Sequence, residues 1–118
     1  MSELYDKQFW DMLDRLVNEN DIVIDRKKDS THPKYPNMIY PVDYGYLKDT
    51  SSMDGSGIDI WMGTDKGRKL SAIICTVDIM KKDSEIKLII GCSEGEKKAA
   101  YRFHNEGPFM KGILIERY

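Results

Sequence analysis

The sequence predicts an α+β protein that is mainly β, a small barrel with helices on its outside. Three observations predict this fold: many short β-type segments, an amphipathic stretch at the front, and a helix signal before the last strand. At 118 residues, and with no repeat, linker or low-complexity segment, residues 1–118 are expected to form a single domain.

The chain is expected to begin with a helix over residues 2–19, because apolar residues recur there at intervals of three and four. A short strand follows at 21–26, where Ile-Val-Ile suits burial. Residues 27–38 are expected to form a loop, because two prolines exclude a helix, and the loop is rich in cations.

From residue 38 onward, the sequence predicts short strands that alternate with turns, and one helix before the last strand. Ser93 and Glu96 form a capping box that should begin a helix running to about residue 104. Asp65-Lys-Gly-Arg68 is expected to be a hairpin turn with Gly67 at the strained position. The strands are expected at 38–41, 44–47, 57–63, 70–80, 85–92 and 111–117.

The composition and net charge exclude some classes of function. With 41% hydrophobic and 32% charged residues, the chain is typical of a globular protein, and its net charge of −2 argues against nucleic-acid binding. No apolar run is long enough to span a membrane, and no secretory leader is visible, so a cytoplasmic protein is expected. Cys75 and Cys92 are expected to be free thiols in a reducing compartment.

Residues 40–60 carry the sharpest functional signal. In Asp54-Gly-Ser-Gly-Ile-Asp59, the glycines allow a tight turn, and the strand that follows can aim Asp54 and Asp59 at one point. Converging carboxylates repel each other unless a cation lies between them, and hard oxygen ligands favour Mg²⁺, with Mn²⁺ as an alternative. The competing interpretation is a solvated turn with ordinary turn-forming aspartates.

Tyr40-Pro-Val-Asp-Tyr-Gly-Tyr46 followed by Asp54-Gly-Ser-Gly-Ile-Asp59 resembles the hallmark of the family I soluble inorganic pyrophosphatases. The family motif is Y-P-x-x-Y-G-[FY] and then D-G-D-P-[LIV]-D. The resemblance covers roughly residues 21–105 and is most specific over 40–60. It implies a five-stranded, OB-like barrel and an Mg²⁺-dependent hydrolase of phosphate metabolism, which splits pyrophosphate with a metal-activated water.

The resemblance also implies roles for individual residues. Asp54, Asp59 and Tyr44 match the catalytic set, and Asp78-Ile-Met-Lys-Lys-Asp-Ser-Glu-Ile-Lys87 resembles the family's second acidic patch. The implied metal ligands are Asp54, Asp59, Asp78 and Glu85, and the implied substrate-binding residues are Lys87, Tyr101 and Arg102. Lys34 or Arg26 is a candidate replacement for a family lysine whose hairpin this chain lacks. The competing interpretation is that Lys87 and Arg102 are solvated cations on the protein surface with no role in binding.

Two departures from the motif keep a second function open. Ser56 stands where the family has its middle aspartate, and Gly57 stands where it has proline. The leading hypothesis is a hydrolase acting on pyrophosphate or a related small phosphorylated compound. The alternative is a catalytically weakened domain that binds a phosphorylated ligand or a protein partner. The aromatic N-terminal helix, with Tyr5, Phe9 and Trp10, would suit a contact in a homo-oligomer.

Overall fold

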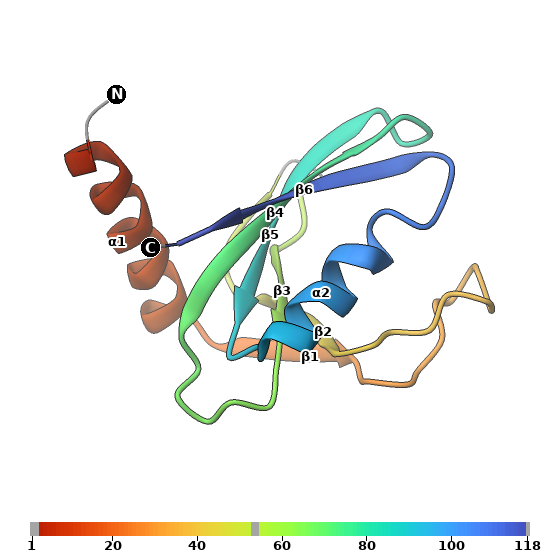
Figure 1. Cartoon of the computed structure of the whole chain (residues 1–118), viewed down its shortest axis with the longest axis horizontal. Coiled ribbons are helices and arrows are strands. Elements are labelled where there is room, and N and C mark those ends of the chain that lie inside the picture. Colours follow the sequence, from red (N-terminus) through yellow and green to blue (C-terminus); the bar gives the residue numbers. More distant parts are fainter. Residues whose placement is uncertain (1–2, 53–54, 118) are drawn as a thin grey trace.

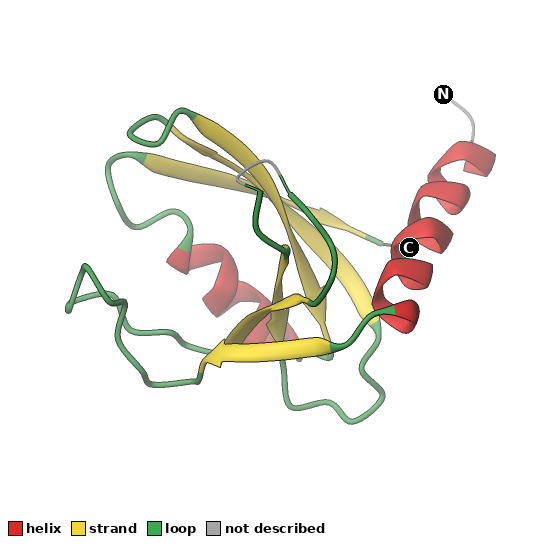
Figure 2. Ribbon diagram, turned by 180° about the vertical axis from the view of Figure 1, so that it is seen from behind, coloured by secondary structure: helices red, strands yellow, loops and turns green. Residues whose placement is uncertain are grey.

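The computed structural model describes residues 3–52 and 55–117 and contains a six-stranded sheet with one helix on each face (Figures 1 and 2). The strand order is β1-β2-β3-β5-β4-β6. The elements are α1 (Glu3–Glu19), β1 (Ile22–Arg26), β2 (Asp43–Leu47), β3 (Ile58–Met62), β4 (Leu70–Asp78), β5 (Asp83–Ile90), α2 (Glu94–Phe103) and β6 (Met110–Glu116). Asp54, the first aspartate of the motif, lies outside the described residues.

Each face of the sheet has an apolar cluster, and a helix packs on each of the two clusters. Because successive side chains of a strand point to opposite faces, Ile60 and Leu88 meet Trp10 of α1, while Trp61 and Ile89 meet Ala100 of α2. All four strand side chains are fully buried. The central strands β3 and β5 therefore contribute core residues to both faces of the sheet.

The expected five-stranded barrel is wrong, because the sheet has six strands and is open. In the described residues β1 and β6 form its two edges, and β1 pairs only with β2 while β6 pairs only with β4. A barrel buries one face of its sheet inside itself. Here a helix covers the apolar cluster on each face, so edge-to-edge closure is not needed to form the core.

The expected hairpin at 65–68 is also wrong. Strand β5 lies between β3 and β4 and pairs with β3 in parallel, so residues 63–69 form a crossover between strands that are not neighbours. The left-handed backbone falls on Arg68, with φ 49°, and not on Gly67. Gly91 does need its conformation: its φ is 62°, and a Cβ there would lie 2.9 Å from the Asp65 carbonyl oxygen.

Both helices lie where the sequence predicts them. Ser93 and Glu96 form the expected capping box at the start of α2. Helix α1 leaves a row of apolar side chains exposed, with Tyr5 at 61% and Met12 at 67%. The homo-oligomer inferred from this helix stays a prediction. Neither helix in the described part of the chain is long and apolar enough to cross a bilayer.

Candidate active site

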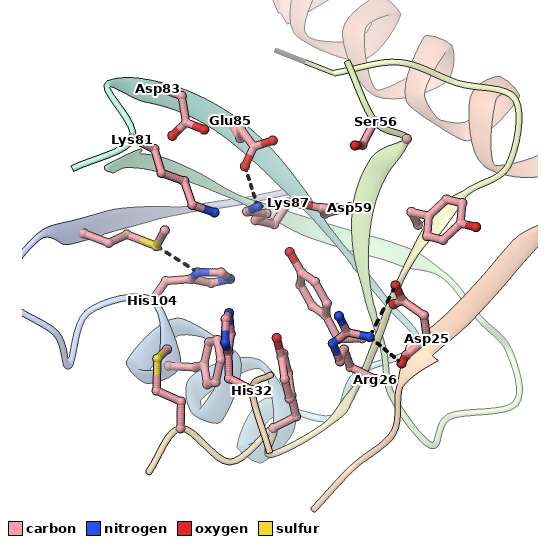
Figure 3. A pocket seen from close by; sticks show the side chains of 17 residues that line it. Asp25, Arg26, His32, Ser56, Asp59, Lys81, Asp83, Glu85, Lys87 and His104 are labelled. Carbon is pink, nitrogen blue, oxygen red and sulfur yellow. Dashed lines mark hydrogen bonds and ion pairs between the residues drawn. The ribbon is translucent and has the colours of Figure 1, made fainter. Parts of the chain in front are cut away.

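A cavity of about 650 Å³ opens on the α2 face of the sheet (Figure 3). Its floor is formed by β2, β3 and β5. The loop between β1 and β2 and the C-terminal end of α2 form one side, and the turn between β4 and β5 forms the other. The cavity thus lies where several connections meet over central strands, which is a common place for a ligand site.

Asp59, Glu85 and Lys87 meet at the floor of this cavity. The Lys87 ammonium donates to Asp59 Oδ2 at 2.6 Å and to Glu85 Oε1 at 2.8 Å. Parallel pairing of β3 with β5 brings Asp59 beside Lys87, and the two-residue period of β5 places Glu85 on the same face as Lys87. Two carboxylates and one ammonium leave this group with one net negative charge.

Lys87 is held as a cation. Its side chain is only 5% exposed. Burial alone would lower its pKa, but the contacts with the Asp59 and Glu85 carboxylates outweigh burial and raise that pKa above its usual value. The Tyr44 ring centroid lies 5.9 Å from Lys87 Nζ, and burial raises the pKa of the Tyr44 hydroxyl, which therefore stays a neutral donor. Both side chains can donate to an anion in the cavity.

Replacing Lys87 by methionine should destabilise the protein by about 3 kcal/mol, the lower end of the range for a broken buried ion pair, because two partly buried carboxylates would lose their shared counter-charge. Urea unfolding of Lys87→Met against wild type measures this loss. Lys81→Met is the matched control, since Lys81 borders the same cavity but is exposed, and it should cost less than about 0.5 kcal/mol. Equal, small losses in both variants would contradict a buried ion cluster.

His104 is a buried histidine at the C-terminal end of α2. Trp61 Nε1 donates to its Nε2 at 3.0 Å, so the neutral ring carries its proton on Nδ1, which lies 3.4 Å from the Met110 sulfur. Burial, helped by the nearby Lys87 charge, lowers the His104 pKa to about 3. This ring therefore fixes Trp61 beneath the cavity and does not act as an acid or base near neutral pH.

His104 should make the protein acid-sensitive. Its pKa falls from 6.5 to about 3 on folding, so its contribution to stability is complete above pH 6.5 and is lost as the pH falls toward 3. The unfolding free energy should therefore decrease across this window by up to about 1.4 kcal/mol per pH unit from this group. His104→Gln should flatten the decrease, measured by urea unfolding at a series of pH values, whereas His32→Gln should change it much less. An unchanged slope in His104→Gln would contradict the assignment.

Structural comparison identifies relatives of this architecture, although no family model and no curated protein matches the sequence. One similar solved structure is an inorganic phosphatase from Anaplasma phagocytophilum, with 13% sequence identity and a TM-score of 0.58 over 80% of this chain and 82% of that one. A second is an inorganic pyrophosphatase from Coxiella burnetii, with 15% identity and a TM-score of 0.55 over 80% of this chain and 84% of that one. A third is the inorganic pyrophosphatase of Helicobacter pylori, with 15% identity and a TM-score of 0.55 over 81% of this chain and 83% of that one. The chain has the fold of the inorganic pyrophosphatases. At these identities the likeness shows the fold alone.

Within this pyrophosphatase fold, the structure brings only some of the predicted residues together. Asp59, Glu85, Lys87 and Tyr44 all line the cavity. The other four predicted residues that are described lie outside its wall: Asp78, Tyr101, Arg102 and Lys34.

Each of these four has a local explanation. The Asp78 carboxylate accepts from the backbone N–H groups of Met80 and Lys81 at 2.9 and 3.1 Å, so it caps the turn between β4 and β5. Tyr101 and Arg102 lie on the outer side of α2 and are exposed. Lys34 is exposed on its loop, where its backbone N–H donates to His32 Nδ1.

The cavity also contains residues that sequence reasoning did not place there. Lys81 and Asp83 come from the β4–β5 turn, and Phe103 and His104 from the end of α2. No local pattern marks these four as site residues, because their convergence depends on how α2 and the turn pack over the sheet. Arg26 lines the cavity as well, and the sequence had named it only as a substitute for a family cation.

The residues present suit Mg²⁺ in chemistry and only partly in number. Asp59 and Glu85 offer hard oxygen donors, and Lys87 contacts one oxygen of each. The other Glu85 oxygen, Oε2, accepts from the Ser52 hydroxyl at 3.4 Å, and each carboxylate oxygen has a further lone pair for a cation. Over residues 3–52 and 55–117, no three carboxylates, histidines or cysteines lie close enough to hold a metal ion. Asp54 is the predicted third ligand.

Proposed function

We propose that this protein hydrolyses a phosphoanhydride bond, with inorganic pyrophosphate as the reference substrate and a divalent cation, Mg²⁺ or Mn²⁺, as cofactor. The buried Asp59–Lys87–Glu85 cluster at the floor of the cavity carries the proposal. A solvated surface lysine would not be buried between two carboxylates. The pyrophosphatase fold supports the same reaction class.

The side chains of the cavity divide into two kinds. Lys87, Lys81 and Arg26 supply positive charge, and Tyr44 a neutral hydroxyl, to bind and orient the phosphoryl oxygens. Asp59 and Glu85, with Asp54, would hold the cation. When bound, that cation would neutralise charge on the substrate and lower the pKa of the attacking water. Phosphoryl transfer needs mainly such positioning and charge neutralisation.

The deciding experiment measures phosphate release from pyrophosphate with Mg²⁺, with Mn²⁺ and with a chelator. Release that needs the cation and is lost in Lys87→Met or Asp59→Asn would support the proposal. Release at the same rate in these variants, or none under any condition, would overturn it. Asp83→Asn is the matched control for a charge change at the rim of the same cavity.

A second candidate function is binding of a phosphorylated ligand without turnover. The observation that favours it is the position of Lys87, which already offsets one of the two carboxylate charges a metal would need. Ser56, which lines the cavity where the family motif has an aspartate, adds no charge. Tight binding of a non-hydrolysable diphosphonate without phosphate release from pyrophosphate would establish this function.

The substrate could be bound by Lys81, which borders the cavity, or by Lys34 on the 27–38 loop, and variants of the two residues distinguish these interpretations. Lys81 borders the cavity and Lys34 does not, so Lys81→Ala should raise the KM for pyrophosphate about tenfold, which is the usual effect of losing one charged hydrogen bond. The sequence instead predicts this effect for Lys34→Ala. Initial rates against substrate concentration, with the melting temperature as a fold control, compare the two variants. A larger change in Lys34→Ala would mean that the 27–38 loop binds substrate.

A further inference from the structure

The cavity has a second wall that pyrophosphate hydrolysis does not use. Aromatic and thioether side chains form it, and Figure 3 shows His32 across the cavity from Asp83 and Glu85. The residues of this apolar wall are His32, Met38, Tyr40, Phe103 and Met110. Pyrophosphate is entirely ionic and gains nothing from such a surface, and a cavity of about 650 Å³ is in the range that holds drug-sized ligands.

The charged floor and the apolar wall are joined by a row of rings. The Tyr44 ring lies 5.9 Å from Lys87 Nζ, and its centroid is 5.5 Å from that of Tyr40. Tyr40 in turn stacks on Phe103 at 4.9 Å. Tyr40 is only 5% exposed, whereas Phe103 is half-buried, so Phe103 still has surface that a ligand could cover. One molecule could thus contact Lys87 at one end and Phe103 at the other.

His32 adds a polar group to this wall. Its ring lies 6.4 Å from that of Tyr40 and is nearly parallel to it, at 11°. Its Nδ1 accepts from the Lys34 backbone N–H at 3.0 Å, so the neutral ring carries its proton on Nε2. Partial burial, with Lys81, Arg26 and Lys34 nearby, lowers the His32 pKa and keeps the ring neutral. A neutral ring with one donor suits a flat ligand that carries acceptor atoms.

We propose that the substrate is an organic phosphoanhydride of the nucleoside diphosphate class, whose heterocyclic ring lies against Phe103 and His32 while its diphosphate lies against Lys87. This inference rests on the proposed function. In the reaction a water oxygen bonds to the terminal phosphorus as the bridging P–O bond breaks, which yields a nucleoside monophosphate, orthophosphate and one proton. An aliphatic diphosphate would contact the same wall but offers no acceptor to His32.

The test compares three non-hydrolysable ligands by calorimetry in the presence of Mg²⁺. They are methylenediphosphonate, α,β-methylene-ADP, and an aliphatic alkyl methylenediphosphonate. Wild type should bind the nucleoside analogue at least about tenfold more tightly than the other two, since stacking of one base on an aromatic side chain strengthens binding by about that factor or more. Phe103→Leu and His32→Ala should each weaken that binding several-fold and leave methylenediphosphonate binding within twofold, about 0.4 kcal/mol.

Two variants are needed because Phe103 packs against the core, so that Phe103→Leu can also weaken the fold. His32 lies on a loop, so His32→Ala should keep the fold and still test the wall. Equal affinity for the nucleoside analogue and methylenediphosphonate, or tighter binding of the aliphatic ligand, would overturn the inference while pyrophosphate hydrolysis could stand. Ring-dependent binding without phosphate release from ADP or pyrophosphate would overturn the proposed hydrolysis and leave the ring-binding wall established.

Discussion

Asp59→Asn is expected to abolish metal-dependent pyrophosphate hydrolysis while leaving the fold intact. The amide has the shape of the carboxylate and can still accept from Lys87, which Asp59 contacts at 2.6 Å, but it supplies no charge to a cation. The Lys87–Glu85 pair at 2.8 Å survives, so the buried cluster goes from one net negative charge to none. The fold should tolerate this change, because no buried charge is left without a partner.

The expected loss in turnover is at least about 10²-fold, the usual result of removing one electrostatic group that acts on the transition state. Initial rates at limiting and saturating Mg²⁺ measure it, and the melting temperature reports on the fold. Asp83→Asn, the same charge change at the cavity rim, should keep most of the activity. Near-normal turnover of Asp59→Asn at limiting Mg²⁺ would show that the metal site is elsewhere.

The local part of the fold could be predicted from the sequence, and its topology could not. Helix α2 begins where Ser93 and Glu96 predict, because a capping box is made by residues three apart. The insertion of β5 between β3 and β4 depends on pairing Ile60 with Leu88, and no local pattern encodes that contact. The barrel was expected because strand patterns do not reveal that helices cover both faces of the sheet.

The same distinction applies to the candidate site. Asp59, Glu85 and Lys87 follow strand periodicity, and the structure brings them within hydrogen-bonding distance. Asp78 was assigned to the metal by the resemblance alone, and the structure shows its carboxylate accepting from the backbone of the turn between β4 and β5. His104 has no sequence signal of its own, since only the packing of α2 on β3 brings it to Trp61.

Ser56→Asp should raise pyrophosphatase activity and lower the Mg²⁺ concentration needed for half-maximal rate. Ser56 lines the same cavity as Asp59 (Figure 3). A serine hydroxyl is too weakly basic to accept a proton from the attacking water near neutral pH, and it carries no charge. With Lys87 offsetting one of two carboxylates, the described part of the site has one net negative charge, which is little for a divalent ion.

A third carboxylate at position 56 would double that net charge and supply a general base, whose loss elsewhere typically costs about 10²–10⁴ in rate. Initial rate against Mg²⁺ concentration for wild type and Ser56→Asp measures both effects, and Ser56→Asn controls for the change in side-chain size. If the aspartate variant gains no rate and needs as much Mg²⁺ as wild type, Ser56 does not lie where the reacting atoms do. If Ser56→Asn gains as much as Ser56→Asp, the gain comes from shape and not from charge or basicity, which would contradict the metal-dependent mechanism.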